Sequence, residues 1–366
     1  MRTIRRLLYR EVLGAVGFVT VGFLALFFFF DFVDELSNVG RRGSAYGLTQ
    51  ALSYVVLLLP SHLYELVPIA VLIGTIFVMA RLAQSSEYTI LRTSGLGPWR
   101  ALRSLLVLGA VFTLFTFAVG DYLAPAADRT AQLLKARYQG NISVGQTGAW
   151  LKDRRPDSSF TVNVAALSPD GTLEGVRIFE ADRQGALLSA TQAARARFAA
   201  EGWTLLEVQQ RLFTTDAQGV PQVRTRELAS LEWPTDLSPE MVSVALLRPE
   251  RMRTLDLFQY IRHLEANEQT SQRYAIQFWR KVFYPLSCLV MVVMALPFAY
   301  LHFRSGSITG FVFGGVLIGI SFFLLNNVFG YIGNLRNWSP WLTAALPGLI
   351  YSVLSLSAFG WLVLRR

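Results

Sequence analysis

The chain contains six apolar runs that are long enough to cross a membrane, arranged as two groups of three around a polar stretch. A helix needs about 20 apolar residues to span roughly 30 Å of hydrocarbon, and this requirement constrains the fold more than any other feature. The sequence therefore predicts a membrane α-helical bundle of six transmembrane helices (3+3). The predicted spans are Val12–Phe32, Ser53–Leu82, Ala101–Leu123, Val282–Leu301, Ile308–Ile332 and Trp341–Leu364.

The charges are divided unevenly between the apolar and polar parts. Residues 125–272 carry 17 Lys/Arg and 18 Asp/Glu, a net charge of −1, although the whole chain has a net charge of +9. The excess of positive charge therefore flanks the apolar runs, as in a polytopic membrane protein. A nucleic-acid-binding protein would instead show a basic stripe on a soluble face. The pattern excludes that class and also a soluble enzyme of two ordinary domains.

Lys and Arg near the short loops predict the orientation, because cytoplasmic loops carry more of them. With the N-terminus inside, eleven such residues fall on the cytoplasmic side and three on the outer side. Both termini are then cytoplasmic, and residues 125–272 lie outside. The inner set is Arg2, Arg5, Arg6, Arg10, Arg81, Arg92, Arg100, Arg103, Arg304, Arg365 and Arg366, and the outer set is Arg41, Arg42 and Arg336.

The polar insert alternates short apolar patterns with turn residues, which is typical of antiparallel strands. It predicts an all-β domain of the sandwich or jelly-roll kind, joined to the spans by helical connectors at Ala126–Tyr138 and Thr254–Glu268. The expected division is 1–124 for spans one to three, 125–272 for the β-domain and 273–366 for spans four to six. The predicted strands are Phe160–Val164, Gly175–Glu180, Ala186–Ala190, Ala194–Phe198, Thr204–Val208 and Val223–Leu228.

No pattern in the sequence points to catalysis, a metal or a bound cofactor. The chain has one cysteine, Cys288, and its three histidines have no ligand spacing. It also has no P-loop with which to hold ATP. Acidic residues within the spans, which often mark ion pathways, are few: Asp31 and Glu65 lie near the outer ends of their spans, and the fourth to sixth spans have no Asp or Glu. A transporter built on this chain would take its energy from a partner.

The loop after the second span predicts a short helix over about residues 84–97. Ser85 or Ser86 suits its N-cap, Glu87 its positively polarised first turn, and Gly95 its C-terminal end. Such a helix on the membrane face suits docking into a groove of a cytoplasmic protein. A plain connector packed on lipid headgroups is the alternative.

Three stretches carry a resemblance to a known family: Phe32-Val-Asp-Glu-Leu36, the Ser86-Glu87…Ser94-Gly95 loop, and Arg273-Tyr-Ala-Ile-Gln-Phe-Trp-Arg-Lys-Val-Phe-Tyr-Pro-Leu286. Together with the 3+3 topology, they resemble the lipopolysaccharide-export ABC transporter permease family, LptF/LptG. The first and third stretches favour the LptG side of the family over the LptF side.

The resemblance implies a non-catalytic permease subunit of the bacterial inner membrane, with its β-domain in the periplasm. Such a subunit extracts lipopolysaccharide from the outer leaflet and passes it to a periplasmic bridge. The implied partners are a cytoplasmic ATPase dimer (LptB-like) that binds the ATP, a sister permease (LptF-like), and a bridge and single-span regulator (LptC/LptA-like) at the β-domain. It implies no nucleic acid and no cofactor of the chain itself.

The resemblance also implies three groups of site residues. The first couples the permease to the ATPase: Glu87, Arg92, Ser86, Tyr88 and Gly95. The second contacts lipid A phosphates at the outer rim: Lys135, Arg137, Arg41, Arg42 and Arg336. The third lines the acyl-chain cavity and its lateral gate: Phe27, Phe30, Phe23, Phe311, Phe322 and Phe323.

The residue pattern leaves other interpretations open. Each Phe could face lipid or a neighbouring helix, and each cation could be solvated. Arg41 and Arg42 also lie farther from Phe32-Val-Asp than the basic residues of the family. Two other classes remain: a lipoprotein-releasing or mechanotransmitting permease, which usually has four spans, and a membrane scaffold for a periplasmic β-domain.

Overall fold

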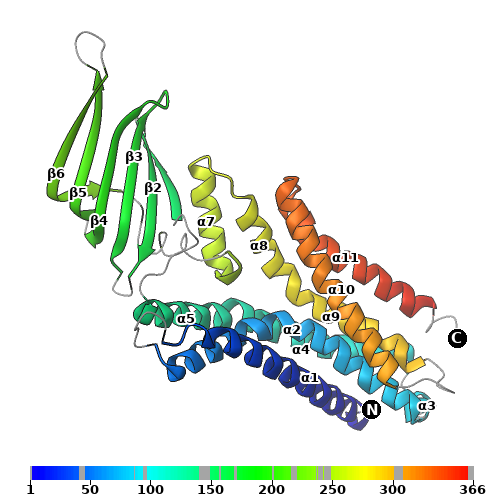
Figure 1. The fold of residues 1–366 in the computed structure, drawn as a ribbon. Coiled ribbons are helices and arrows are strands. Elements are labelled where there is room, and N and C mark those ends of the chain that lie inside the picture. The colour runs from blue at the N-terminus through cyan, green and yellow to red at the C-terminus, as the bar shows by residue number, and fades with distance from the viewer. Residues whose placement is uncertain are drawn as a thin grey trace. The chain divides into compact units, whose positions relative to one another are not determined.

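The computed structural model describes residues 2–40, 46–85, 87–93, 97–139, 149–155, 158–168, 171–199, 202–215, 221–235, 237, 242, 249–300 and 308–361. The chain divides into two compact units (Figure 1). The helical unit comprises Met1–Glu35, Val55–Ala127 and Ala275–Arg366, and the sheet unit comprises Leu36–Tyr54 and Asp128–Tyr274.

Six helical segments have the length and apolarity of membrane spans, which confirms the predicted 3+3 arrangement. The first and second are α1 (Arg2–Leu36) and α2 (Leu48–Gln84), and α2 continues through Pro60 and Pro68. The fifth and sixth are α10 (Ile308–Leu335) and α11 (Pro340–Phe359). The short helix α3 (Glu87–Thr93) follows the second span, as predicted.

The third and fourth spans are longer than the sequence predicted. The third runs from α4 (Pro98–Ala118) through a π-helical turn (Val119–Leu123) directly into α5 (Ala124–Gln139), the first predicted connector. The fourth begins at Gln272, not Val282, because Arg280 and Lys281 lower the hydropathy of its first turns. It comprises α8 (Gln272–Phe283), α9 (Ser287–Ala295) and the 3₁₀ turns Tyr284–Leu286 and Leu296–Tyr300, each of which contains a proline.

Helix α2 lies at the centre of the helical unit because small residues let its neighbours approach closely. A Cβ at Gly74 of α2 would come within 2.7 Å of the backbone nitrogen of Val16 in α1. On α10, a Cβ at Gly319 would come within 2.7 Å of Ile69. The backbones of α1 and α2 are therefore in close contact, and the backbone of α10 packs directly on the Ile69 side chain of α2.

The sheet unit contains six antiparallel strands in the sequential order β1 to β6 (Figure 1). They are β1 (Ala149–Arg154), β2 (Ser158–Leu167), β3 (Leu173–Asp182), β4 (Leu187–Ala199), β5 (Gly202–Thr215) and β6 (Pro221–Pro234). Within the described ranges these strands form one hydrogen-bonded sheet. Alternate residues of β2, such as Phe160, Val162 and Val164, are buried, as expected for a sheet with one covered face.

The structure changes three details of the predicted strands. Ala186–Ala190 and Ala194–Phe198 are one strand, β4, because the intervening Thr-Gln-Ala contains no turn residue. Strand β1 was missed, since its Lys152, Asp153 and Arg154 hide the alternation. Strands β5 and β6 also extend well beyond their predicted ends. The second connector is confirmed as α7 (Thr254–Ala266), whose Tyr260 and Leu264 join the core of the sheet.

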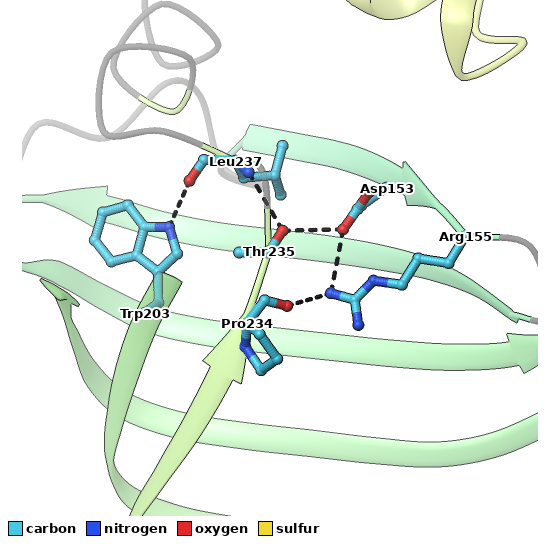
Figure 2. A network of polar contacts seen from close by, with 6 residues as sticks. All are labelled: Asp153, Arg155, Trp203, Pro234, Thr235 and Leu237. Carbon is cyan, nitrogen blue, oxygen red and sulfur yellow. Dashed lines mark hydrogen bonds and ion pairs between the residues drawn. The ribbon is translucent and has the colours of Figure 1, made fainter. Parts of the chain in front are cut away.

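A network of polar contacts joins the two edges of this sheet (Figure 2). Arg155, just after β1, donates to the Pro234 carbonyl at the end of β6, and the Thr235 hydroxyl donates to Asp153 at 2.9 Å. Trp203 Nε1 donates to the Leu237 carbonyl at 2.7 Å. A flat six-stranded sheet would hold its edge strands about 24 Å apart. The contacts therefore require a strongly twisted and curled sheet around its apolar core.

Candidate functional site

Helix α3 is held on the bundle by one of the residues predicted to couple the permease to the ATPase. Tyr88 is buried, and its hydroxyl donates to the Tyr300 hydroxyl at 3.0 Å, at the end of the fourth span. The two rings also meet edge to face, with centroids 5.2 Å apart. Tyr88 therefore packs inside its own chain, on the underside of the seven-residue helix, and its coupling role stays a prediction.

The remaining coupling residues differ in what the structure describes. Glu87 is exposed at the first position of α3, and Ile90 one turn later is also exposed. Arg92 lies in α3, but its side chain is outside the described set, as are Ser86 and Gly95. Ser85 does not cap α3; its hydroxyl donates back to the Arg81 carbonyl at 3.1 Å, which closes α2. The exposed face of α3 thus carries Glu87.

Two of the predicted phosphate-binding cations are described, one in each unit. Lys135 lies on α5, half-buried, with its Nζ 4.5 Å from the ring centroid of Tyr54. A cation over an aromatic ring is stabilised by the ring's electrons. Arg336 is exposed just after α10. Arg41 and Arg42 lie outside the described residues, and so does the side chain of Arg137.

The predicted gate residues of the first span lie in the second half of α1. Phe23 and Phe27 are half-buried, and the Phe27 ring meets the His62 ring of α2 with centroids 4.8 Å apart. Phe30 is 60% exposed. These residues therefore leave apolar surface on α1 that this chain does not cover.

On α10 the three predicted Phe differ in environment. Phe311 packs at the edge of the bundle core beside Phe298, and Phe323 is 37% exposed. Phe322, by contrast, is 2% exposed and lies against the rings of Tyr284 and Tyr351. The prediction for Phe322 is wrong, because adjacent residues of a helix point in different directions.

Polar contacts inside the helical unit were missed at the level of sequence. Lys281 is buried in the fourth span, and its Nζ donates to the Gly120 carbonyl at 2.9 Å. Gly120 lies in the π-helical turn of the third span, where a Cβ would collide with the Tyr64 ring. Asp31 and His62 also form a contact of 2.6 Å between α1 and α2. Lys281 escaped notice because the predicted span began one residue after it.

The part of the chain that the structure describes holds no cluster of three His, Cys, Asp or Glu side chains suited to a metal ion. The described residues include the short helix α3, which carries the exposed carboxylate of Glu87, and two spans, α1 and α10, whose apolar faces are largely exposed. Within the apolar 18-residue stretch of each span, the protein buries 11% of the residues in α1 and 17% in α10, against 83% in α2.

Comparisons with known proteins agree with this architecture. The family described as "Lipopolysaccharide export system permease LptF/LptG" matches residues 6–365. The chain is similar to the lipopolysaccharide export system permease protein LptG of Escherichia coli K12, with 29% identity over 339 residues, which cover 92% of this chain and 90% of that protein. It is also similar to the LptG protein of Haemophilus influenzae, with 25% identity over an alignment covering 100% of this chain and 99% of that protein.

Proposed function

The chain belongs to the LptF/LptG family of lipopolysaccharide export system permeases, and from this premise we propose how its parts work. It is a permease subunit of an ABC transporter for lipopolysaccharide export, resembling LptG, and it is not itself an enzyme. The observation that carries this assignment is the match along nearly the whole chain, spans and sheet unit together. In this proposal the subunit takes lipopolysaccharide from the outer leaflet and passes it to a periplasmic bridge.

The protein is a multi-pass protein of the inner membrane. In the proposed orientation, both termini are cytoplasmic and residues 125–272 are periplasmic. The eleven-to-three distribution of Lys and Arg supports this orientation. It places α3 on the cytoplasmic face and the sheet unit in the periplasm, where its curled sheet meets the bridge and a single-span regulator.

The proposed energy source is a cytoplasmic ATPase dimer that binds ATP and docks on α3. Glu87 faces the ATPase, while Tyr88 ties α3 to the fourth span through Tyr300. Because α3 also follows directly on α2, a displacement of α3 would pull on two spans at once. Arg92, Ser86 and Gly95 belong to the same proposed contact.

A charge reversal on α3 tests this coupling. We expect Glu87→Lys to uncouple ATP hydrolysis from lipopolysaccharide export, since the reversed charge repels a surface that Glu87 complements. Export and hydrolysis are measured in proteoliposomes that contain the complete transporter. The control is Glu227→Lys, an exposed reversal on β6, in which ATPase binding and hydrolysis stay normal. Normal export by Glu87→Lys at normal expression would contradict the assignment.

The proposed path for the acyl chains uses the bare faces of the first and fifth spans. Phe23, Phe27 and Phe30 of α1, with Phe311 and Phe323 of α10, form one half of a cavity that a sister permease completes. The exposure of α1 and α10 supports this, because apolar faces within a membrane unit must meet lipid or another helix. The lateral gate then lies between the first span of one permease and the fifth span of the other.

The proposed phosphate contacts lie at the outer rim. Lys135 is held over Tyr54, so its charge is positioned before a ligand arrives. Arg336 is exposed at the end of α10, and Arg137, Arg41 and Arg42 complete the proposed set. Charge-assisted hydrogen bonds to phosphate make such a rim suitable for lipid A.

Native mass spectrometry of the tagged protein, purified gently from its own membranes, tests the assembly. We expect a particle with two ATPase copies, one sister permease and a bound lipopolysaccharide. An ATPase partner with a bound lipoprotein instead would favour a lipoprotein-releasing permease. The chain alone, with neither ATPase nor glycolipid, would contradict the proposed coupling helix.

A further inference from the structure

A cavity of about 480 Å³ opens between α1, α2 and α10, at the end of the helical unit where α1 begins. This volume lies in the range of small-molecule sites. Helix α1 contributes Arg10, Glu11, Gly14 and Phe18, α2 contributes Ile73 and Arg81, and α10 contributes Val312. None of the residues proposed above for coupling, phosphate contact or the lateral gate lines it.

The mouth of the cavity is charged. Arg81 Nη2 donates to Glu11 Oε2 at 2.6 Å, which joins α1 to α2. Arg10 is exposed and forms no ion pair with any residue that the structure describes. The mouth thus carries two guanidinium groups and one carboxylate, which pairs with Arg81 alone, and has a net charge of +1. An anionic group with several acceptor oxygens matches this arrangement.

Below the mouth the wall is apolar, and mouth and wall together extend about as far along α1 as one leaflet is thick. The lining runs along α1 from Arg10 to Val19, which is about 14 Å at the rise of an α-helix. Half of the hydrocarbon thickness of a bilayer is about 15 Å. A site with cations at one end and an apolar slot below them matches the headgroup and acyl chain of a single lipid molecule.

We propose that this cavity binds one anionic phospholipid, with its phosphate at Arg10 and Arg81 and one acyl chain along Gly14, Phe18 and Ile73. In the orientation proposed above, the lipid comes from the cytoplasmic leaflet, so the site is separate from the entry path of the exported glycolipid. Lipid binding at this position joins α1 and α2 just before α3, the coupling helix.

Two glycines of α1 provide a matched test. A Cβ at Gly14 or at Gly17 meets no atom within 4 Å, so a side chain added at either position begins in open space. Gly14 lines the cavity and Gly17 does not. Gly14→Leu fills the slot for the acyl chain, and Gly17→Leu adds the same side chain one turn away, at a position outside the lining.

The experiment is native mass spectrometry of the purified transporter, depleted of lipid and titrated with phosphatidylglycerol or with phosphatidylcholine of the same chain length. We expect the wild type to retain one phosphatidylglycerol with roughly tenfold preference over phosphatidylcholine, the factor given by about 1.4 kcal/mol. Gly14→Leu should lose this adduct, Gly17→Leu should keep it, and Arg10→Gln should abolish the preference for the anionic lipid.

Equal retention of the two lipids by the wild type would overturn the proposal, as would an unchanged adduct in Gly14→Leu. Loss of the sister permease from Gly14→Leu, with Gly17→Leu intact, would overturn it too, because the cavity would then be a protein interface. The readout is independent of lipopolysaccharide export, so its failure is distinguishable from failure of the proposed function.

Discussion

Helices α1 and α2 are nearly equal in hydropathy, at 2.4 and 2.2, yet opposite in burial. Within the apolar 18-residue stretch of each helix, the protein buries 83% of the residues in α2 and only 11% of the residues in α1. Hydropathy measures the transfer of a segment into the membrane. It does not measure which other segments then cover that segment. The comparison shows that one helix is the core of the unit, while the other supplies a surface.

That difference has a consequence for assembly. Exposed aromatic residues such as Phe18 of α1 and Phe313 of α10 are 82% and 61% exposed. Inside a membrane such faces meet lipid or another subunit. The two spans proposed for the lateral gate are thus the two that this chain leaves least covered.

The largest effect is expected from a substitution that pushes α1 away from α2. Gly74→Leu should destabilise the helical unit by about 3 kcal/mol or more, because the new side chain meets the backbone of Val16 rather than a flexible side chain. Thermal unfolding of the purified protein in detergent measures the loss. Gly22→Leu on α1, where a Cβ meets nothing within 4 Å, serves as the control. A Gly74→Leu variant as stable as the control would mean that the two helices are not packed as described.

Two adjacent residues of α10 test the same difference in burial within one helix. Phe322→Ala should cost about 3 kcal/mol, the low end for a buried phenylalanine, because lipid supplies no hydrophobic driving force between helices. Phe323→Ala should cost less than about 0.5 kcal/mol, as at other exposed positions. The same unfolding measurement decides between them. Equal losses would remove the distinction between the buried and exposed faces of α10.

A smaller effect concerns the anchor of α3. Tyr88→Phe removes one hydrogen bond, to Tyr300, and should cost about 1 kcal/mol. Because the anchor links α3 to the fourth span, the amount of lipopolysaccharide exported per ATP should fall by up to about fivefold. Tyr331→Phe removes the same atom from a residue that is 69% exposed and should leave export unchanged. An unaltered ratio in Tyr88→Phe would exclude the hydrogen bond from coupling.

The smallest expected effect concerns the pKa of a partly buried group outside the membrane, His263. Burial lowers the pKa of His263 on α7 below its ordinary value near 6.5, and Asp153 opposes this only in part. The unfolded state then binds the proton more readily, so stability falls as the pH decreases below about 6.5. Hydrogen exchange of the α7 amides in the full-length protein measures this. His263→Gln should remove the pH dependence, and a dependence that persists would assign it to another group.

Particular residues show which features could be predicted from the sequence and which could not. The spans, the insert between them and the short helix after the second span followed from hydropathy and turn residues, which act locally. The prediction of two separate strands within β4 was wrong, because a short stretch with few apolar residues is not by itself a turn. The burial of Tyr88 was not predicted, because the sequence of a seven-residue helix does not reveal which side faces the bundle.

The sequence by itself determined that this chain crosses the membrane six times around a β-rich insert, because the cost of placing a polar segment in hydrocarbon depends on that segment alone. Only the tertiary structure decided that α2 is the core, that Phe322 and Tyr88 are buried, and that Arg10 and Arg81 share one cavity. Those outcomes depend on how closely two backbones approach, and Gly74 and Gly319 permit that approach only with particular partners.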